Sequence, residues 1–249
     1  MTTPTIIANW KCNPDNMRSA LRLIENTEHL LNKTKYKYYI AAPDTMIYQL
    51  REYDIIATIG AQNYNYIEGG AHTGSSRISQ IVDAGAQFVI LGHSEVRAKG
   101  ETESEIAEKV AHALSSDLRV VLCVGEKLRD DKGIYVEELA RQVRVVVAAL
   151  DTDKLSKLII AYEPIWAVGS SSPATPAESL EVAIIIRREL AQIVGLHNAK
   201  QTQIIYGGSV NASNAHHFIA EGGVDGLLIG RDSLDAEDFA TIINNCWEL

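Results

Sequence analysis

The segment LIIAYEPIW, residues 158–166, decides the fold, because it is an apolar run that ends in a carboxylate directly before a proline. A continuous apolar run is typical of a parallel strand that is buried on both faces. A residue that precedes proline is restricted to extended backbone, which fixes the direction of the Glu163 side chain. The segment therefore predicts a buried parallel strand with a carboxylate at its C-terminal end.

Seven more runs of this kind occur along the chain. They are TIIANW (5–10), YYIAAP (38–43), IIATIGAQN (55–63), FVILGHS (88–94), RVVLCVG (119–125), QIIYGGSV (203–210) and GLLIGRDS (226–233). Eight runs in 249 residues correspond to about one run every 31 residues. This is the spacing of successive βα units.

Helical patterns lie between the runs. Apolar residues recur at helical spacing over 135–150. Capping boxes begin at Thr102 and Thr175, and the second places Pro176 at the favoured first helical position. Alternating strands and helices form either a closed barrel or an open doubly wound sheet. The count of eight, without G-x-G-x-x-G after the first strand, favours the barrel. We therefore predict one α/β domain over 1–249, a (β/α)8 TIM barrel.

Composition excludes several classes of function. The net charge of -9 opposes binding to nucleic acid, although local backbone amides can still hold a small anion. The three cysteines are far apart and form no CxxC pair, so neither a disulfide framework nor a structural zinc site is expected. No signal peptide and no membrane-spanning run is visible. We expect a cytoplasmic protein with no metal or other cofactor.

Polar residues stand at the C-terminal ends of the predicted strands, where barrels carry their active sites. They include Asn9, Lys11, Gln62, Asn63, His93, Ser94, Glu95, Glu126, Glu163, Ser209, Gly230 and Arg231. Any one of these residues, taken alone, could simply belong to an ordinary ion-pair network. Together they predict that a base (Glu163), an electrophile (His93) and a cation (Lys11) lie at the same end of the barrel, which we call its mouth. Glycines follow the seventh and eighth predicted strands, at Gly207-Gly208-Ser209 and at Gly230. They could simply form tight turns, but their presence in both loops favours a phosphate-binding site.

Several segments resemble the triosephosphate isomerase family in order and spacing over essentially the whole chain. They are ANWKCN (8–13), GHSEVR (92–97), AYEPIWAVG (161–169), YGGSV (206–210) and DGLLIGRDSL (225–234). The resemblance implies a homodimeric enzyme of glycolysis and gluconeogenesis. It would interconvert dihydroxyacetone phosphate and D-glyceraldehyde 3-phosphate through an enediol(ate).

The resemblance also implies roles for individual residues. Glu163 would be the carbon base, and His93 would move protons between the substrate oxygens. Lys11 and Asn9 would stabilise the oxyanion, with Glu95 holding Lys11. Residues 165–174 would form a lid. The phosphate would be held by the backbone amides of Gly169, Ser209, Gly230 and Arg231.

Other interpretations of three residue types stay open at this stage. Lys11 could be a Schiff-base nucleophile, although pairing with Glu95 would keep it charged and unreactive. Glu126 could act in the site, but a hydrogen-bonding role fits better. Cys12 and Cys123 could be reactive, but buried, inert thiols are the favoured interpretation.

The chain departs from the family pattern at three places. Arg231 replaces the second residue of a glycine pair, which implies a strained positive φ, a guanidinium in solvent, or an added charge beside the phosphate. Ser170–Ser172 and Pro173 alter the tip of the lid. Ser75 and Val96 replace a charged pair that would cross the dimer interface. Packing is therefore expected to hold the homodimer, with His72 and Thr73 inserted into the neighbour.

Two alternative functions remain. The Arg231 and lid changes are compatible with a paralogous isomerase of a larger substrate such as a tetrulose phosphate. A non-catalytic sugar-phosphate-binding barrel is the other alternative. It would predict the loss of Glu163 or His93, and both are present.

Overall fold

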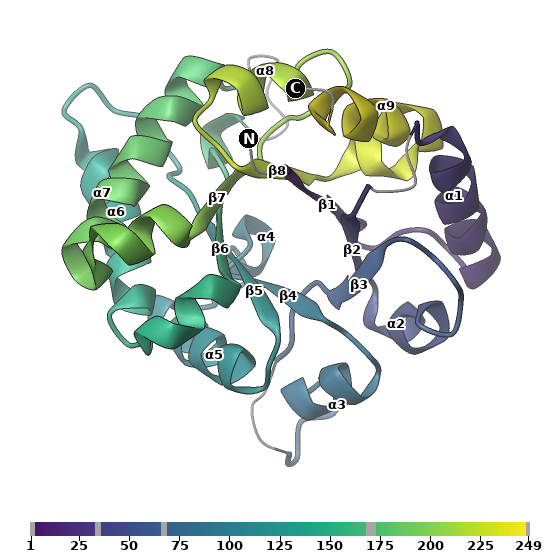
Figure 1. The fold of residues 1–249 in the computed structure, drawn as a ribbon. Helices are drawn as coiled ribbons and strands as arrows, with labels where there is room; N and C mark the ends of the chain where they lie inside the picture. Colours follow the sequence, from purple (N-terminus) through teal and green to yellow (C-terminus); the bar gives the residue numbers. More distant parts are fainter. Residues whose placement is uncertain (1–2, 33–35, 66–68, 168–172, 248–249) are drawn as a thin grey trace.

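A computed structural model of the chain, which describes residues 3–32, 36–65, 69–167 and 173–247, forms a closed barrel of eight parallel strands (Figure 1). The strands are β1 (Thr5–Asn9), β2 (Tyr38–Ala42), β3 (Thr58–Ala61), β4 (Phe88–Leu91), β5 (Arg119–Val124), β6 (Leu158–Tyr162), β7 (Gln203–Tyr206) and β8 (Gly226–Ile229). β1 pairs in parallel with both β2 and β8, which closes the barrel. The predicted (β/α)8 TIM barrel is therefore confirmed, and the open sheet is excluded.

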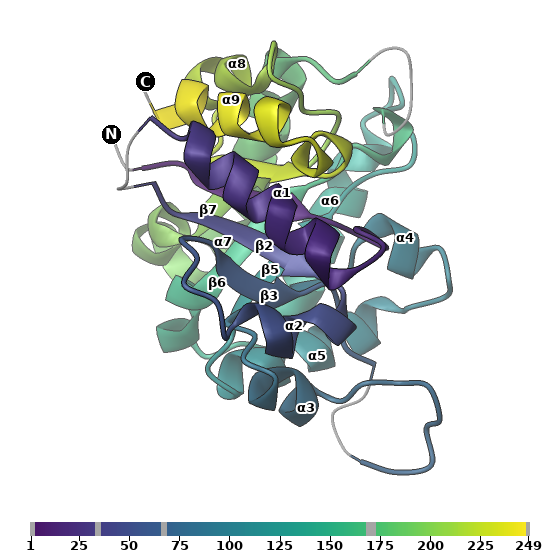
Figure 2. The same ribbon diagram turned by 90° about the vertical axis from the view of Figure 1, so that its right-hand side faces the viewer.

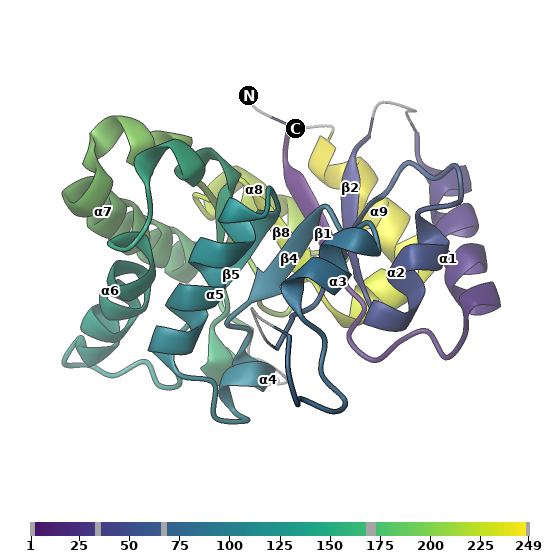
Figure 3. The ribbon, with the colours of Figure 1, turned by 90° about the horizontal axis from the view of Figure 1, so that it is seen from below.

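The helices surround the barrel in a ring, except for the short α4 (Ser94–Arg97), which lies at one end of the barrel (Figure 1 and Figure 3). They are α1 (Met17–Leu30), α2 (Asp44–Leu50), α3 (Ile78–Asp83), α4 (Ser94–Arg97), α5 (Glu103–Ser115), α6 (Ile134–Val147), α7 (Pro176–Gln201), α8 (Ala215–Glu221) and α9 (Ala236–Trp247). The described residues also form the short 3-10 helices η1 (Thr152–Lys157), η2 (Ile165–Ala167) and η3 (Arg231–Leu234). Both predicted capping boxes are present, at Thr102 and Thr175, with Pro176 in the first turn. The helix predicted over 135–150 ends earlier, at Val147, because the chain then turns through i→i+3 bonds.

The side chains of the strands form two apolar layers. One layer fills the barrel and includes Phe88, Ile159 and Leu228, while Ile160 lies in the layer between strands and helices. A Cβ on Gly60 would approach the Phe88 ring to 2.2 Å, so only glycine leaves room for this ring inside the barrel. Burial on both faces explains why the strands read as continuous apolar runs.

The two ends of the barrel differ in what they carry. Every observed strand is shorter than the apolar run that predicted it, and the residues beyond the strand enter the loops at its C-terminal end. Figure 3 shows the start of β1 at one end of the barrel and α4, which follows β4, at the other. The polar strand-end residues therefore gather at the end that carries α4.

Candidate active site

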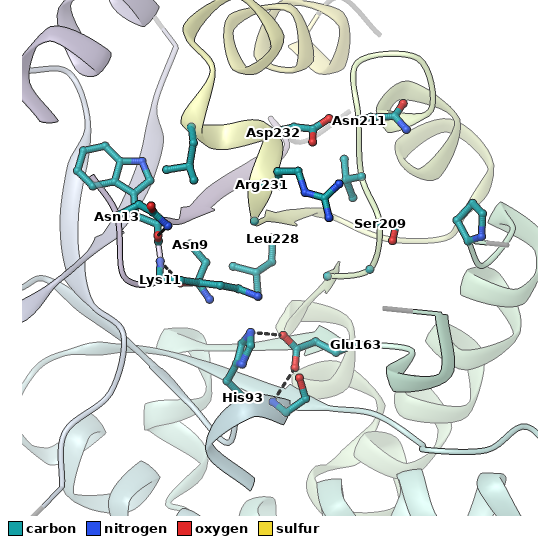
Figure 4. A pocket seen from close by; sticks show the side chains of 18 residues that line it. Asn9, Lys11, Asn13, His93, Glu163, Ser209, Asn211, Leu228, Arg231 and Asp232 are labelled. Carbon is teal, nitrogen blue, oxygen red and sulfur yellow. Dashed lines mark hydrogen bonds and ion pairs between the residues drawn. The ribbon is translucent and has the colours of Figure 1, made fainter. Parts of the chain in front are cut away.

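A cavity of about 750 Å³ opens at the C-terminal ends of the strands (Figure 4). Its lining includes residues from loops after five different strands: Asn9, Lys11, His93, Glu163, Ser209, Gly230 and Arg231. These residues are far apart in the sequence, and barrel closure brings them together. Glu95 and Glu126 do not line the cavity.

His93 and Glu163 contact each other on the floor of this cavity. The distance between His93 Nε2 and Glu163 Oε1 is 3.0 Å, and both residues are buried, at 8% and 4% exposed. The backbone N–H of Ser94 donates to Glu163 Oε2 at 3.1 Å. The carboxylate is thus held by groups that follow β4, while its own backbone follows β6.

The position of His93 at the start of α4 determines which ring nitrogen carries the proton. The backbone N–H of Glu95 donates to His93 Nδ1 at 3.2 Å, so this nitrogen accepts and is unprotonated. In the neutral ring the proton then lies on Nε2, which faces Glu163. A neutral imidazole with Nε2–H directed into the cavity can donate to a ligand oxygen.

Lys11 has an unusual backbone conformation, with φ of 53°, in the left-handed region that few non-glycine residues adopt. Its N–H donates to Asn9 Oδ1 at 3.1 Å, and Gln62 Nε2 donates to the Lys11 carbonyl at 2.7 Å. Gln62 also donates to the carbonyl of Ala41 at 3.1 Å, which ties the strained residue to β2. Sequence reasoning noted Gln62 at a strand end but assigned it no role.

The Lys11 ammonium is paired with Glu95, with Nζ 2.5 Å from Oε1. Burial alone would raise the pKa of the Glu95 carboxyl, but the hydrogen bond and charge of Lys11 outweigh it and lower this pKa below its ordinary value. The carboxylate therefore stays ionised beside the lysine. This pairing favours a fixed cation over a neutral Schiff-base nucleophile at Lys11.

The loop after β7, with Gly207 and Gly208, and the loop after β8, with Gly230, line the cavity beside these groups. A Cβ on Gly208 would lie 2.2 Å from the hydroxyl oxygen of Tyr206, so the loop requires glycine there. Arg231 does not have a positive φ, so the possibility of backbone strain at this position was wrong. Gly169 and the lid tip, Ser170–Ser172, lie outside the described residues.

Glu126 is fully buried beside the cavity. Tyr162 and Trp166 donate to its Oε1 at 2.9 and 2.7 Å. Burial raises the pKa of this carboxyl, against the lowering effect of the two donors. Glu126 thus supports the start of the 165–174 segment through hydrogen bonds, as its predicted role requires.

Of the two cysteines predicted to be buried, one is buried and one is exposed. Cys123 is buried inside the barrel, and burial raises the pKa of its thiol well above the ordinary value. Cys12 is exposed, so the interpretation of Cys12 as a buried thiol was wrong. Cys12 directly follows Lys11, whose φ is 53°.

The residues expected at a dimer interface lie away from the cavity. His72, Thr73 and Ser75 are exposed on the segment between β3 and α3, which projects from the barrel (Figure 2). The base of this segment is fixed by Ser76, whose hydroxyl donates to Asp44 Oδ2 at 2.7 Å. Val96 is partly exposed on α4.

Comparison with known proteins agrees with this geometry. The family model described as triosephosphate isomerase matches residues 4–246. The chain belongs to the triosephosphate isomerase family. A relative named triosephosphate isomerase from Caldanaerobacter subterraneus subsp. tengcongensis is 35% identical over 98% of this chain and 100% of its own length. One of the same name from Coprinopsis cinerea is 37% identical over 95% of each chain, and one from Corynebacterium diphtheriae is 36% identical over 98% and 96%.

Within the described ranges, no helix combines the length and the apolar composition that crossing a bilayer requires.

Proposed function

We propose that this chain interconverts dihydroxyacetone phosphate and D-glyceraldehyde 3-phosphate through an enediol(ate), in one catalytic domain over 1–249 and without a cofactor. Membership in the triosephosphate isomerase family supports the reaction. The observation that carries the proposal is the contact between His93 Nε2 and Glu163 Oε1 on the floor of a cavity that also holds Lys11. A carboxylate, an imidazole N–H and a cation are the groups that proton transfer next to a carbonyl requires.

Glu163 acts as the carbon base. To reach a substrate carbon, its carboxylate leaves the N–H groups of Ser94 and His93 that hold it in the structure. It then removes the proton next to the carbonyl and returns it to the neighbouring carbon. Pro164 keeps the Glu163 backbone extended, so that only the side chain has to move.

His93 becomes available when Glu163 moves. Its Nε2–H donates to the carbonyl oxygen and then exchanges protons between the two substrate oxygens. Lys11 and Asn9 stabilise the negative oxygen of the enediolate. Each preorganised donor of this type contributes about 3 kcal/mol to lowering the barrier. Glu95 acts through Lys11, because it orients the ammonium without lining the cavity.

The substrate phosphate binds between the loops after β7 and β8. The proposed donors are the backbone amides of Ser209, Gly230 and Arg231, together with Gly169 from the lid segment. Barrels commonly bind phosphate at this place. Closing the 165–174 segment over the site would keep water away from the intermediate.

We further propose that the protein is a cytoplasmic homodimer. The segment over 69–75 is exposed and projects from the barrel, as a surface that inserts into a neighbour would (Figure 2). His72 and Thr73 are the residues proposed to make this contact.

A coupled isomerase assay with purified protein tests the proposed function. We expect rapid conversion of D-glyceraldehyde 3-phosphate, with a kcat/KM at least about tenfold above that for a tetrulose phosphate. The names of the relatives favour this substrate over the larger one. The absence of turnover with the triose phosphate, or a preference for the tetrulose phosphate, would contradict the proposal.

A further inference from the structure

Arg231 places a side chain on the cavity where the family pattern has a glycine. It is the first residue of η3, directly after β8 and Gly230, and it lines the cavity. Figure 4 shows its guanidinium pointing from η3 toward the side of the cavity that carries Ser209 and Asn211. A positive charge thus faces the side of the cavity that carries the loop after β7.

Arg231 differs from two other arginines of the protein in its partners. Arg97 and Arg187 each pair with a carboxylate and donate to backbone carbonyls, which explains them structurally. By contrast, across the ranges that the structure describes, the guanidinium of Arg231 has no hydrogen bond and no ion pair. Burial raises the pKa of the Asp232 carboxyl, and the charge of Arg231 counteracts this rise, but the two groups form no ion pair. The guanidinium is therefore available to a ligand.

We propose that the guanidinium of Arg231 binds the substrate phosphate directly, in addition to the backbone amides, and sets the affinity for phosphorylated ligands. This inference rests on the proposed function for the identity of the substrate. A guanidinium matches two oxygens of a phosphate at once. It also counteracts the repulsion of a dianion by a chain whose net charge is -9.

This contact changes binding more than chemistry. The phosphate does not react, so Arg231 holds it equally in the ground state and in the transition state. Uniform binding of this kind lowers KM and leaves kcat unchanged. Arg231 is thus a determinant of ligand affinity, while Lys11 and Glu163 act on the reacting atoms.

Isothermal titration with inorganic phosphate, at fixed pH and ionic strength, tests the proposal. The variants are Arg231→Gln, which removes the charge, and Arg231→Lys, which keeps the charge without the planar fork. Arg188→Gln is the matched control, because Arg188 is exposed on α7, outside the cavity, and its loss changes the net charge equally. We expect the Kd for phosphate to rise about tenfold in Arg231→Gln and less in Arg231→Lys. In the control it should stay within about twofold.

A rise of less than about fivefold in Arg231→Gln would overturn the inference, as would a loss of kcat with an unchanged KM. The isomerase assay on the unsubstituted chain separates this inference from the proposed function. Turnover together with phosphate binding that is insensitive to Arg231 rejects only the role of Arg231. Phosphate binding that depends on Arg231, without turnover, rejects only the proposed reaction.

Discussion

Carboxylates lie at both ends of the barrel, but they are partnered differently. At the N-terminal end, Asp225 precedes β8, and its Oδ2 accepts from the Ile204 N–H at 2.9 Å and from Arg187 Nη2 at 3.2 Å. At the C-terminal end, Glu163 accepts from His93 and Ser94, inside a cavity large enough for a ligand. Asp225 thus ties together elements that must stay fixed, whereas the partners of Glu163 are groups that a ligand can take over.

Residues that stabilise the fold and residues that serve the activity lie at opposite ends of the barrel. Thr5 and Gln203, the first residues of β1 and β7, also bond to each other at the N-terminal end, at 3.2 Å. This hydrogen bond joins two strands within the protein. At the mouth, Lys11 and Arg231 keep donors directed at the cavity. Substitutions at the mouth should therefore reduce activity, and those at the other end should reduce stability.

The largest effect is expected for Lys11→Met, which keeps the length of the side chain and removes the charge. Loss of oxyanion stabilisation should lower kcat/KM by about 10²- to 10³-fold. The melting temperature should change by less than about 3 °C, because a partly exposed ion pair contributes little stability. Steady-state kinetics and thermal unfolding measure the two effects.

Lys157→Met is the matched control for this variant. Lys157 lies in η1 before β6, at the opposite end of the barrel, and pairs with Asp117. Its kcat/KM should stay within about twofold of the unsubstituted value. If Lys11→Met retained more than about a tenth of the activity, the mouth would not be the site of catalysis.

Asp225→Ala should have a smaller effect, and the effect should be on stability. It removes the acceptor of the Ile204 N–H and of Arg187, so the free energy of unfolding should fall by about 2 kcal/mol. The value of kcat/KM should not change. Urea unfolding provides the measurement, with Asp54→Ala as the control at an exposed residue. A loss of activity in the folded Asp225→Ala variant would break the division between the two ends.

Local patterns were sufficient to predict the barrel and most of the candidate site. Continuous apolar runs identified the eight strands, and short capping signals at Thr102 and Thr175 identified helix starts. The strand-end rule then placed Lys11, His93 and Glu163 at one mouth. These features depend on residues that are close in sequence or on a general property of the fold.

Features that depend on contacts between distant loops could not be predicted. The positive φ of Lys11 is stabilised by Gln62, 51 residues away. Cys12, the residue after Lys11, is exposed, although cysteines are usually buried. The direction of the Arg231 guanidinium depends on η3, which has no clear signal in the sequence.

Exchange of the carbon-bound hydrogens of dihydroxyacetone phosphate with solvent deuterium tests the central claim most directly. Proton NMR would follow the exchange with the unsubstituted chain and with Glu163→Gln, and titration with inorganic phosphate would verify that the variant still binds ligand. We predict exchange in step with turnover for the unsubstituted chain, and a rate about 10³-fold lower for Glu163→Gln. Exchange by Glu163→Gln within about tenfold of the unsubstituted rate would contradict the assignment of Glu163 as the carbon base.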